Sequence, residues 1–161
     1  MFKKMMLISM LALSIFCLNS GFASAEETAS NEVQVTYYDE NDEVIKSETV
    51  ETDTTPQMLA FTSKSFGNTI FSNYVYINSG ATFYNPHHVD FELSNRPSKM
   101  SVKAYTASST YKGKVTFEGA GLTGWQTADL DWLARGTSYK IALVNEGSGE
   151  VRIRGGYIKY N

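Results

Sequence analysis

The chain has 161 residues, of which 42% are hydrophobic and 19% charged, and its formal net charge at pH 7 is −3. A negative net charge without a nucleic-acid-binding motif argues against nucleic acid as a partner. The only cysteine, Cys17, lies near the N-terminus, so the rest of the chain has no disulfide bond, thiolate metal site or cysteine nucleophile.

Residues 1–25 have the three parts of a secretory signal peptide. Lys3 and Lys4 precede an apolar stretch at residues 5–18, and Ala23-Ser24-Ala25 is a small-x-small cleavage site. The apolar stretch is shorter than the roughly 20 residues that a membrane-spanning helix needs. We therefore predict a cleaved signal peptide, a secreted bacterial protein without a transmembrane segment, and an extracellular or cell-wall-associated location.

The remaining residues are enough for one domain with its own core. Residues 26–32 are almost free of apolar side chains and are predicted to be a disordered lead-in. Charge is separated along the chain, because residues 26–53 carry ten acidic residues and one basic residue, whereas residues 54–161 carry seven and eleven. This split allows the two parts to attract each other or to meet different partners, and a solvated acidic surface is the simpler interpretation.

Residues 33–50 are predicted to form an acidic β-hairpin with its turn at residues 39–43. The carboxylates around Asn41 are hard oxygen ligands of the kind that calcium prefers. However, the turn lacks the glycine and the distant glutamate of a calcium-binding loop, so an ordinary exposed turn is favoured. Residues 52–61 are interpreted as a loop, because Pro56 would interrupt a strand ladder.

The middle of the chain is predicted to consist of further strands. The segment 63–84 contains two short strands around a turn at residues 78–80, and a core hairpin is favoured there over a hairpin that inserts into a membrane. Clearer alternation predicts strands at residues 89–93, 99–104 and 114–117. Trp125 follows several glycines and is placed in a flexible loop.

Residues 128–134 are predicted to form a single helical turn, capped by Thr127 and closed by Gly136. A strand is the alternative, because Ala128, Leu130 and Trp132 also alternate with polar residues.

The C-terminal residues 136–161 show the clearest pattern in the chain. Two alternating strands flank residues 145–149, which suit a tight turn and predict a β-hairpin. The apolar positions are odd-numbered up to Ile153 and even-numbered from Ile158, so we predict a one-residue bulge at Gly155-Gly156. The side chains expected in the core are Tyr139, Ile141, Leu143, Val151 and Ile153.

Leu133, Gly136, Thr137 and Tyr139 stand in the order L-x-x-G-T-x-Y. This order resembles the tyrosine corner of Greek-key sandwiches such as fibronectin type III domains, where a Tyr hydroxyl bonds back to the backbone. The resemblance covers about a dozen residues and implies a sandwich, although Arg135 replaces the usual proline. Together with the strand spacing, it predicts a single all-β domain over residues 33–161, an antiparallel β-sandwich of Greek-key or jelly-roll type.

The sequence has no G-x-S-x-G elbow, phosphate-binding loop or H-E-x-x-H motif. His87 and His88 should point in opposite directions, whereas His88 and Asp90 should share a face and offer two metal ligands, one fewer than a catalytic zinc site uses. Asp90 and Glu92 are assigned to the solvent side of their strand as surface charges. We therefore predict no catalytic residue, metal or cofactor, and a small metal-dependent hydrolase is a minor alternative.

Binding is the predicted function. Trp125 and Trp132 offer flat rings that stack on sugars or anchor protein interfaces, and core packing is the alternative for both. Five basic residues are expected to form one sheet face that attracts anionic polymers: Lys112, Lys114, Arg152, Arg154 and Lys159. The hypothesis is a secreted, non-catalytic module that binds an extracellular polysaccharide, an anionic wall polymer or a protein. The alternatives are a self-assembling surface protein that uses exposed strand edges and, last, a membrane-active toxin.

Overall fold

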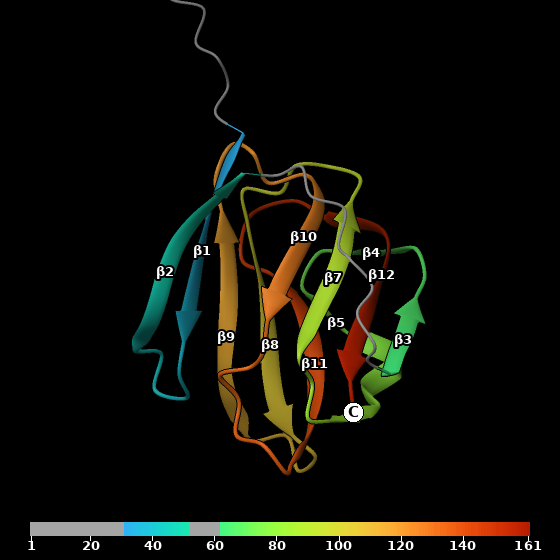
Figure 1. Ribbon diagram of the computed structural model, residues 1–161. Coiled ribbons are helices and arrows are strands. Elements are labelled where there is room, and N and C mark those ends of the chain that lie inside the picture. Colours follow the sequence, from blue (N-terminus) through green and yellow to red (C-terminus); the bar gives the residue numbers. More distant parts are fainter. Residues whose placement is uncertain (1–30, 52–61) are drawn as a thin grey trace, which may run out of the picture.

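A computed structural model describes residues 31–51 and 62–161, whose strands form two sheets packed face to face (Figure 1). Sheet A has the strand order β2-β1-β9-β8-β11-β5, and β6 also pairs with β11. Sheet B has the order β10-β7-β12-β3, and β4 also pairs with β12. Every pairing between these strands is antiparallel. The predicted all-β sandwich is therefore confirmed.

The strands of sheet A are β1 (Glu32–Tyr38), β2 (Val44–Glu51), β5 (Tyr74–Tyr76), β6 (Thr82–Tyr84), β8 (Lys99–Thr106), β9 (Tyr111–Glu118) and β11 (Ser138–Asn145). Those of sheet B are β3 (Thr62–Phe66), β4 (Thr69–Phe71), β7 (His88–Leu93), β10 (Gly124–Asp129) and β12 (Val151–Tyr160). One short 3₁₀ helix, η1 (Ile77–Gly80), is the only helix in these ranges, and it is neither long nor apolar enough to cross a membrane. The predicted signal peptide, residues 26–30 of the lead-in and the loop at 52–61 lie outside the described residues.

The core lies between the two sheets. It is built from the side chains that point inward at alternate positions along the strands. All five core residues predicted for the C-terminal segment are buried, with at most 2% of their surface exposed. Burial of an aliphatic or aromatic side chain of this kind contributes roughly 1.5–3 kcal/mol relative to exposure. The period-two pattern therefore identified the inner faces of β11 and β12 correctly.

The acidic hairpin is confirmed as β1 and β2, and it forms the end of sheet A because β1 also pairs with β9. Two carboxylates of its turn meet lysines of β9: Glu40 pairs with Lys112, and Asp42 Oδ1 lies 3.0 Å from Lys114 Nζ. The acidic turn and the basic body are therefore in direct contact through these ion pairs, beside the β1–β9 strand pairing.

The predicted C-terminal hairpin is wrong, because β11 belongs to sheet A and β12 to sheet B. Strands that face each other across a core show the same alternation as strands that pair edge to edge, so the pattern does not distinguish them. A bulge is present in β12, but it lies one residue earlier than predicted, because the β12–β7 register shifts between Ile153 and Gly155. The tyrosine corner is also present: Tyr139 Oη donates a hydrogen bond to Ala134 O at 2.9 Å.

Two further local predictions need correction. β10 continues to Asp129 and is followed by a turn in which Leu133 N donates to Leu130 O at 3.0 Å, so no helix begins at Thr127 and Trp125 lies on a strand. The expected core hairpin within residues 63–84 is absent too, because β5 and β6 both pair with β11 and β4 pairs with β12. Short strands of this kind carry little information about their partners.

Candidate binding cleft

The predicted single basic face is wrong. Lys112 and Lys114 lie on β9 in sheet A, whereas the other three basic residues lie on β12 in sheet B. Each is also paired with a carboxylate, in the pairs Lys112–Glu40, Lys114–Asp42, Arg152–Glu150, Arg154–Glu92 and Lys159–Asp90. Alternation indicates which side of a strand faces outward, but it does not assign the strand to a sheet.

Trp125 lies on the outer side of sheet B. Its ring is half-buried and contacts Tyr157, with the ring centroids 6.0 Å apart. Its neighbour across the strand pair is Glu92, which in turn pairs with Arg154. Two of the predicted binding residues, Trp125 and Arg154, therefore share one neighbourhood, and Arg152 binds Glu150 instead.

Asp90 and Lys159 are buried on the same side of sheet B, with 0% and 2% of their surfaces exposed, so their assignment to an exposed charged face was wrong. Asp90 Oδ1 accepts a hydrogen bond from Thr127 Oγ1 at 2.6 Å, and its Oδ2 lies 3.5 Å from His88 Nε2 and 3.8 Å from Lys159 Nζ. The strand pattern identified the face of each side chain, whereas burial depends on what packs against that face.

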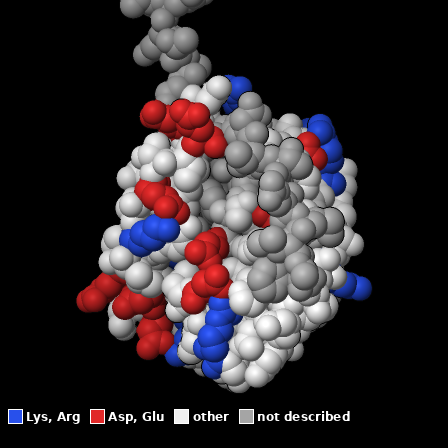
Figure 2. Space-filling view, viewed as in Figure 1, with Lys and Arg blue, Asp and Glu red and all other residues white. Residues whose placement is uncertain are grey.

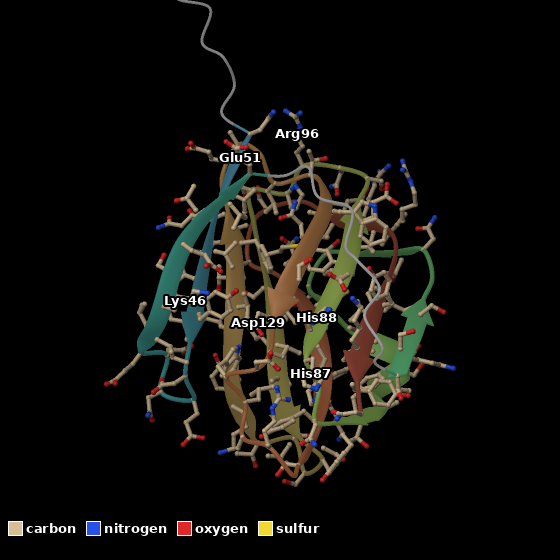
Figure 3. The ribbon with its side chains drawn as sticks, in the orientation of Figure 1. Lys46, Glu51, His87, His88, Arg96 and Asp129 are labelled. Atoms are coloured by element: carbon tan, nitrogen blue, oxygen red, sulfur yellow. The ribbon has the colours of Figure 1, made fainter. Side chains whose placement is uncertain are left out.

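The histidines follow their predicted directions, since His87 Nδ1 lies 2.7 Å from Asp131 Oδ1 while His88 contacts Asp90. Figure 3 shows His88 beside Asp129, its partner in the β10–β7 register. Burial lowers the pKa of His88 below its ordinary value, and Asp90 partly opposes this shift. In residues 31–51 and 62–161 no three His, Cys, Asp or Glu side chains gather as they would around a metal ion.

Trp132 lies in the turn after β10, and its ring rests on Gly113 of β9. A Cβ atom on Gly113 would lie 2.7 Å from Trp132 Cη2 and 2.3 Å from Tyr38 O, and the φ angle of Gly113 is 127°. Glycine at this position therefore leaves room for the indole ring. Trp132 Nε1 donates to Asp129 O at 3.0 Å, which orients the ring, and the side chain is only partly buried.

Trp132 and Lys112 line one cleft of about 310 Å³, which we call the end cleft. Its walls are the acidic turn on one side and the turn after β10 on the other, and its lining residues are Asp39, Glu40, Asn41, Ile45, Lys112, Trp132, Leu133, Ala134 and Tyr139. Small-molecule sites have volumes of roughly 300–1,000 Å³ and mix apolar walls with a few polar groups. The end cleft reaches the lower limit of this range and has that composition.

The acidic wall is held in place by its own hydrogen bonds. Asp39 Oδ1 accepts hydrogen bonds from the backbone N–H groups of Asn41 at 2.8 Å and Glu43 at 2.9 Å. Hydrogen bonds from Lys114 and Tyr111 hold the pKa of Asp42 below its ordinary value. The carboxylates of the turn thus contact backbone amides and lysines of the body, which is unlike the convergent oxygen cage of a calcium site. Figure 2 shows the carboxylates gathered along the hairpin side of the molecule.

The sequence interpretation missed a row of four tyrosines in sheet A, which we call the tyrosine row. Tyr74, Tyr76, Tyr105 and Tyr111 are in successive contact, with ring centroids 5.6, 6.0 and 5.8 Å apart. Burial raises the pKa of Tyr105, which keeps its phenol protonated. Tyr105 continues the outward phase of Lys99, Ser101 and Lys103 on β8, and this was the available signal.

The row also connects to the acidic wall, because Tyr111 Oη donates to Asp42 Oδ1 at 2.9 Å. The structure thus brings Trp132 and Lys112 together in the end cleft, with Lys114 supporting its acidic wall through Asp42. Trp125 and the two arginines lie on the other sheet. Comparison of the chain with known protein families, curated proteins and solved structures finds no match.

Proposed function

We propose that this protein is a secreted, non-catalytic binding module that holds a sugar residue of a neutral extracellular polysaccharide in the end cleft. The observation that carries the proposal is the cleft of about 310 Å³ with an indole ring on one wall and carboxylates on the other. A sugar ring has apolar C–H faces, which pack on an aromatic ring, and a rim of hydroxyl groups. Hydrogen bonds between such hydroxyls and charged acceptors contribute about 1.5–3 kcal/mol.

The charges of the cleft favour a neutral ligand over the anionic polymer suggested by the sequence. Asp39 and Glu40 outnumber Lys112 in the lining, and Lys112 already pairs with Glu40. An anionic chain would meet net repulsion there. Secretion itself rests on the signal-peptide pattern of residues 1–25.

The contacts of these carboxylates also suit a binding role. Glycoside hydrolysis needs a carboxyl group that gives a proton to the leaving-group oxygen. Glu40 instead pairs with Lys112, and Asp39 Oδ1 accepts hydrogen bonds from two backbone N–H groups, so both side chains already have partners within the protein.

The proposal is tested with isothermal titration calorimetry of the mature protein against soluble neutral polysaccharides and acidic ones. Trp132→Phe and Glu40→Gln are expected to weaken binding of a neutral polysaccharide about tenfold each, which corresponds to about 1.4 kcal/mol. Trp125→Phe is the matched control, because Trp125 is also a half-buried tryptophan but lies outside this cleft. Unchanged affinity in both cleft variants, an equal loss in the control, or tighter binding of acidic polymers would refute the proposal.

Self-assembly through a sheet edge is a second candidate, favoured by the outer edge of β2. Within the described residues β2 pairs only with β1, and Val44 and Ile45 on this strand are 60% and 51% exposed. An open edge of this kind is a template for another strand. Sedimentation velocity should then show concentration-dependent dimers that Val44→Lys abolishes, whereas a monomer at every concentration eliminates this candidate.

A further inference from the structure

A second cavity, of about 210 Å³, lies next to η1, and we call it the η1 pocket. It is lined by Phe66, Gly67, Asn68, Thr69, Val75, Tyr76, Ile77, Asn78, Ser79 and Leu143, none of which is charged. The pocket adjoins β5, whereas the end cleft adjoins the β1–β2 hairpin, and these elements lie at opposite ends of sheet A (Figure 1). The two cavities are therefore separate sites.

The backbone beside the pocket is strained. Asn78 has φ 48° and ψ 46°, Ser79 has φ 57° and ψ 29°, and Gly80 continues with φ 85°. A left-handed conformation costs a residue with a Cβ atom roughly 1–2 kcal/mol, and asparagine tolerates it better than most. Strained segments of this kind persist where the surrounding structure holds them, and they cluster at ligand sites.

Asn78 also has an unsatisfied donor. Its Nδ2 atom is buried and has no hydrogen-bond partner within the described residues. A buried polar group without a partner costs about 1–3 kcal/mol, so a ligand that supplies an acceptor recovers this free energy. The strain and the unsatisfied amide thus fall on one residue that lines a cavity.

We infer that the η1 pocket binds the acetamido group of an N-acetylated sugar. An acetamido carbonyl is a strong, uncharged acceptor for Asn78 Nδ2, and its methyl group suits the apolar side chains of Val75 and Ile77. Phe66 and Tyr76 also line the pocket, and aromatic side chains suit the apolar face of the attached sugar. The volume is below the roughly 300–1,000 Å³ of sites for larger ligands, so the pocket accommodates one sugar residue.

The experiment uses NMR of the ¹⁵N-labelled mature protein, titrated in parallel with N-acetylglucosamine and with glucose, which lacks the acetamido group. Saturable shifts are expected for the Asn78 side-chain amide and the backbone amides of η1, with an affinity for glucose at least tenfold weaker. Asn78→Asp keeps the shape and the tolerance for left-handed φ but removes the donor, so the shifts should be lost. Asn73→Asp is the matched control, because Asn73 is exposed, lies in the same segment and does not line the pocket.

A third variant separates ligand binding from folding. Asn78→Gly relieves the left-handed strain, so it should be at least as stable as the parent protein and yet fail to bind N-acetylglucosamine. The inference is overturned by an absence of saturable shifts at η1, by an equal response to glucose, or by unchanged binding in Asn78→Asp or Asn78→Gly. Trp132→Phe should leave these shifts unchanged, so failure of the end cleft and failure of this pocket are distinguishable.

Discussion

Gly113→Ala should disturb the fold and the end cleft together. The new methyl group would lie 2.3 Å from the backbone oxygen of Tyr38 and 2.7 Å from the ring of Trp132. Rotation of a side chain does not relieve the first overlap, so the β1–β9 pairing has to move. Overpacking of this kind costs about 1–3 kcal/mol. The strain of a non-glycine residue at φ 127° adds roughly 1–3 kcal/mol, so the total loss is about 2–6 kcal/mol.

The assay is urea unfolding, followed by tryptophan fluorescence in a Trp125→Phe background, in which Trp132 is the only tryptophan. The matched control is Gly149→Ala. Gly149 has φ 82°, and a Cβ atom there would meet nothing within 4 Å, so this variant carries backbone strain without overlap. Gly113→Ala should lose more stability than this control, shift the native emission of Trp132 and weaken ligand binding in the end cleft. A loss below about 0.5 kcal/mol, which is typical of a neutral surface change, would refute the packing argument.

Three further outcomes are expected. Tyr139→Phe removes the hydrogen bond to the carbonyl of exposed Ala134 and should lower the free energy of unfolding in urea by about 0.5–1.5 kcal/mol. An unchanged free energy of unfolding would show that the tyrosine corner does not contribute to stability. Lys159→Met leaves Asp90 buried without its ammonium partner and should cost about 3–5 kcal/mol, which a neutral result would contradict. Because burial lowers the pKa of His88, the folded state prefers the neutral ring, so stability is retained above the ordinary histidine pKa of about 6.5 and falls as pH drops below it. His88→Gln should flatten this part of the stability–pH curve, and an unchanged curve would show that His88 does not cause it.

The sequence was informative where a strand buries one face. Tyr139, Ile141 and Leu143 were assigned to the core correctly, because their alternation depends only on the strand itself. The same pattern could not separate β11 from β12 into different sheets, since both hairpins and facing strands bury one side of each strand. Asp90 shows the related limit: its face was predicted correctly, but its burial depends on contacts made by other parts of the molecule.

The candidate sites were less accessible to prediction, because both need segments that are distant in sequence. Trp132 and Lys112 were singled out separately, and only the pairing of β1 with β9 brings them to one cleft with the acidic turn. In the sequence, Asn78 is recognisable only as part of a turn, since neither its left-handed backbone nor its unsatisfied amide can be inferred from the residue type. The chemistry of a single residue can be identified from the sequence. Which distant residues meet in one cleft depends on the three-dimensional structure.

The tyrosine row extends from one candidate site toward the other. Tyr76 lines the η1 pocket and contacts Tyr105, while Tyr111 at the far end hydrogen-bonds to Asp42 in the acidic turn that walls the end cleft. A neutral polymer of N-acetylated sugars that contacts both sites would gain effective concentration at the second site once it is held at the first. Affinity should therefore rise more steeply with oligosaccharide length than single-residue binding predicts.

Tyr105→Ala tests this coupling. Tyr105 lies in the middle of the tyrosine row, between Tyr76 and Tyr111, but it lines neither cavity. In calorimetric titrations with N-acetylglucosamine oligomers of increasing length, the variant should retain the affinity for the single sugar and lose the steep gain for longer chains. Tyr84→Ala serves as the control, since Tyr84 is an exposed tyrosine of the same sheet that lies outside the tyrosine row and lines neither cavity. If longer oligomers bind the parent protein no more tightly than the single sugar, the two sites act independently and the tyrosine row is a surface feature of sheet A alone.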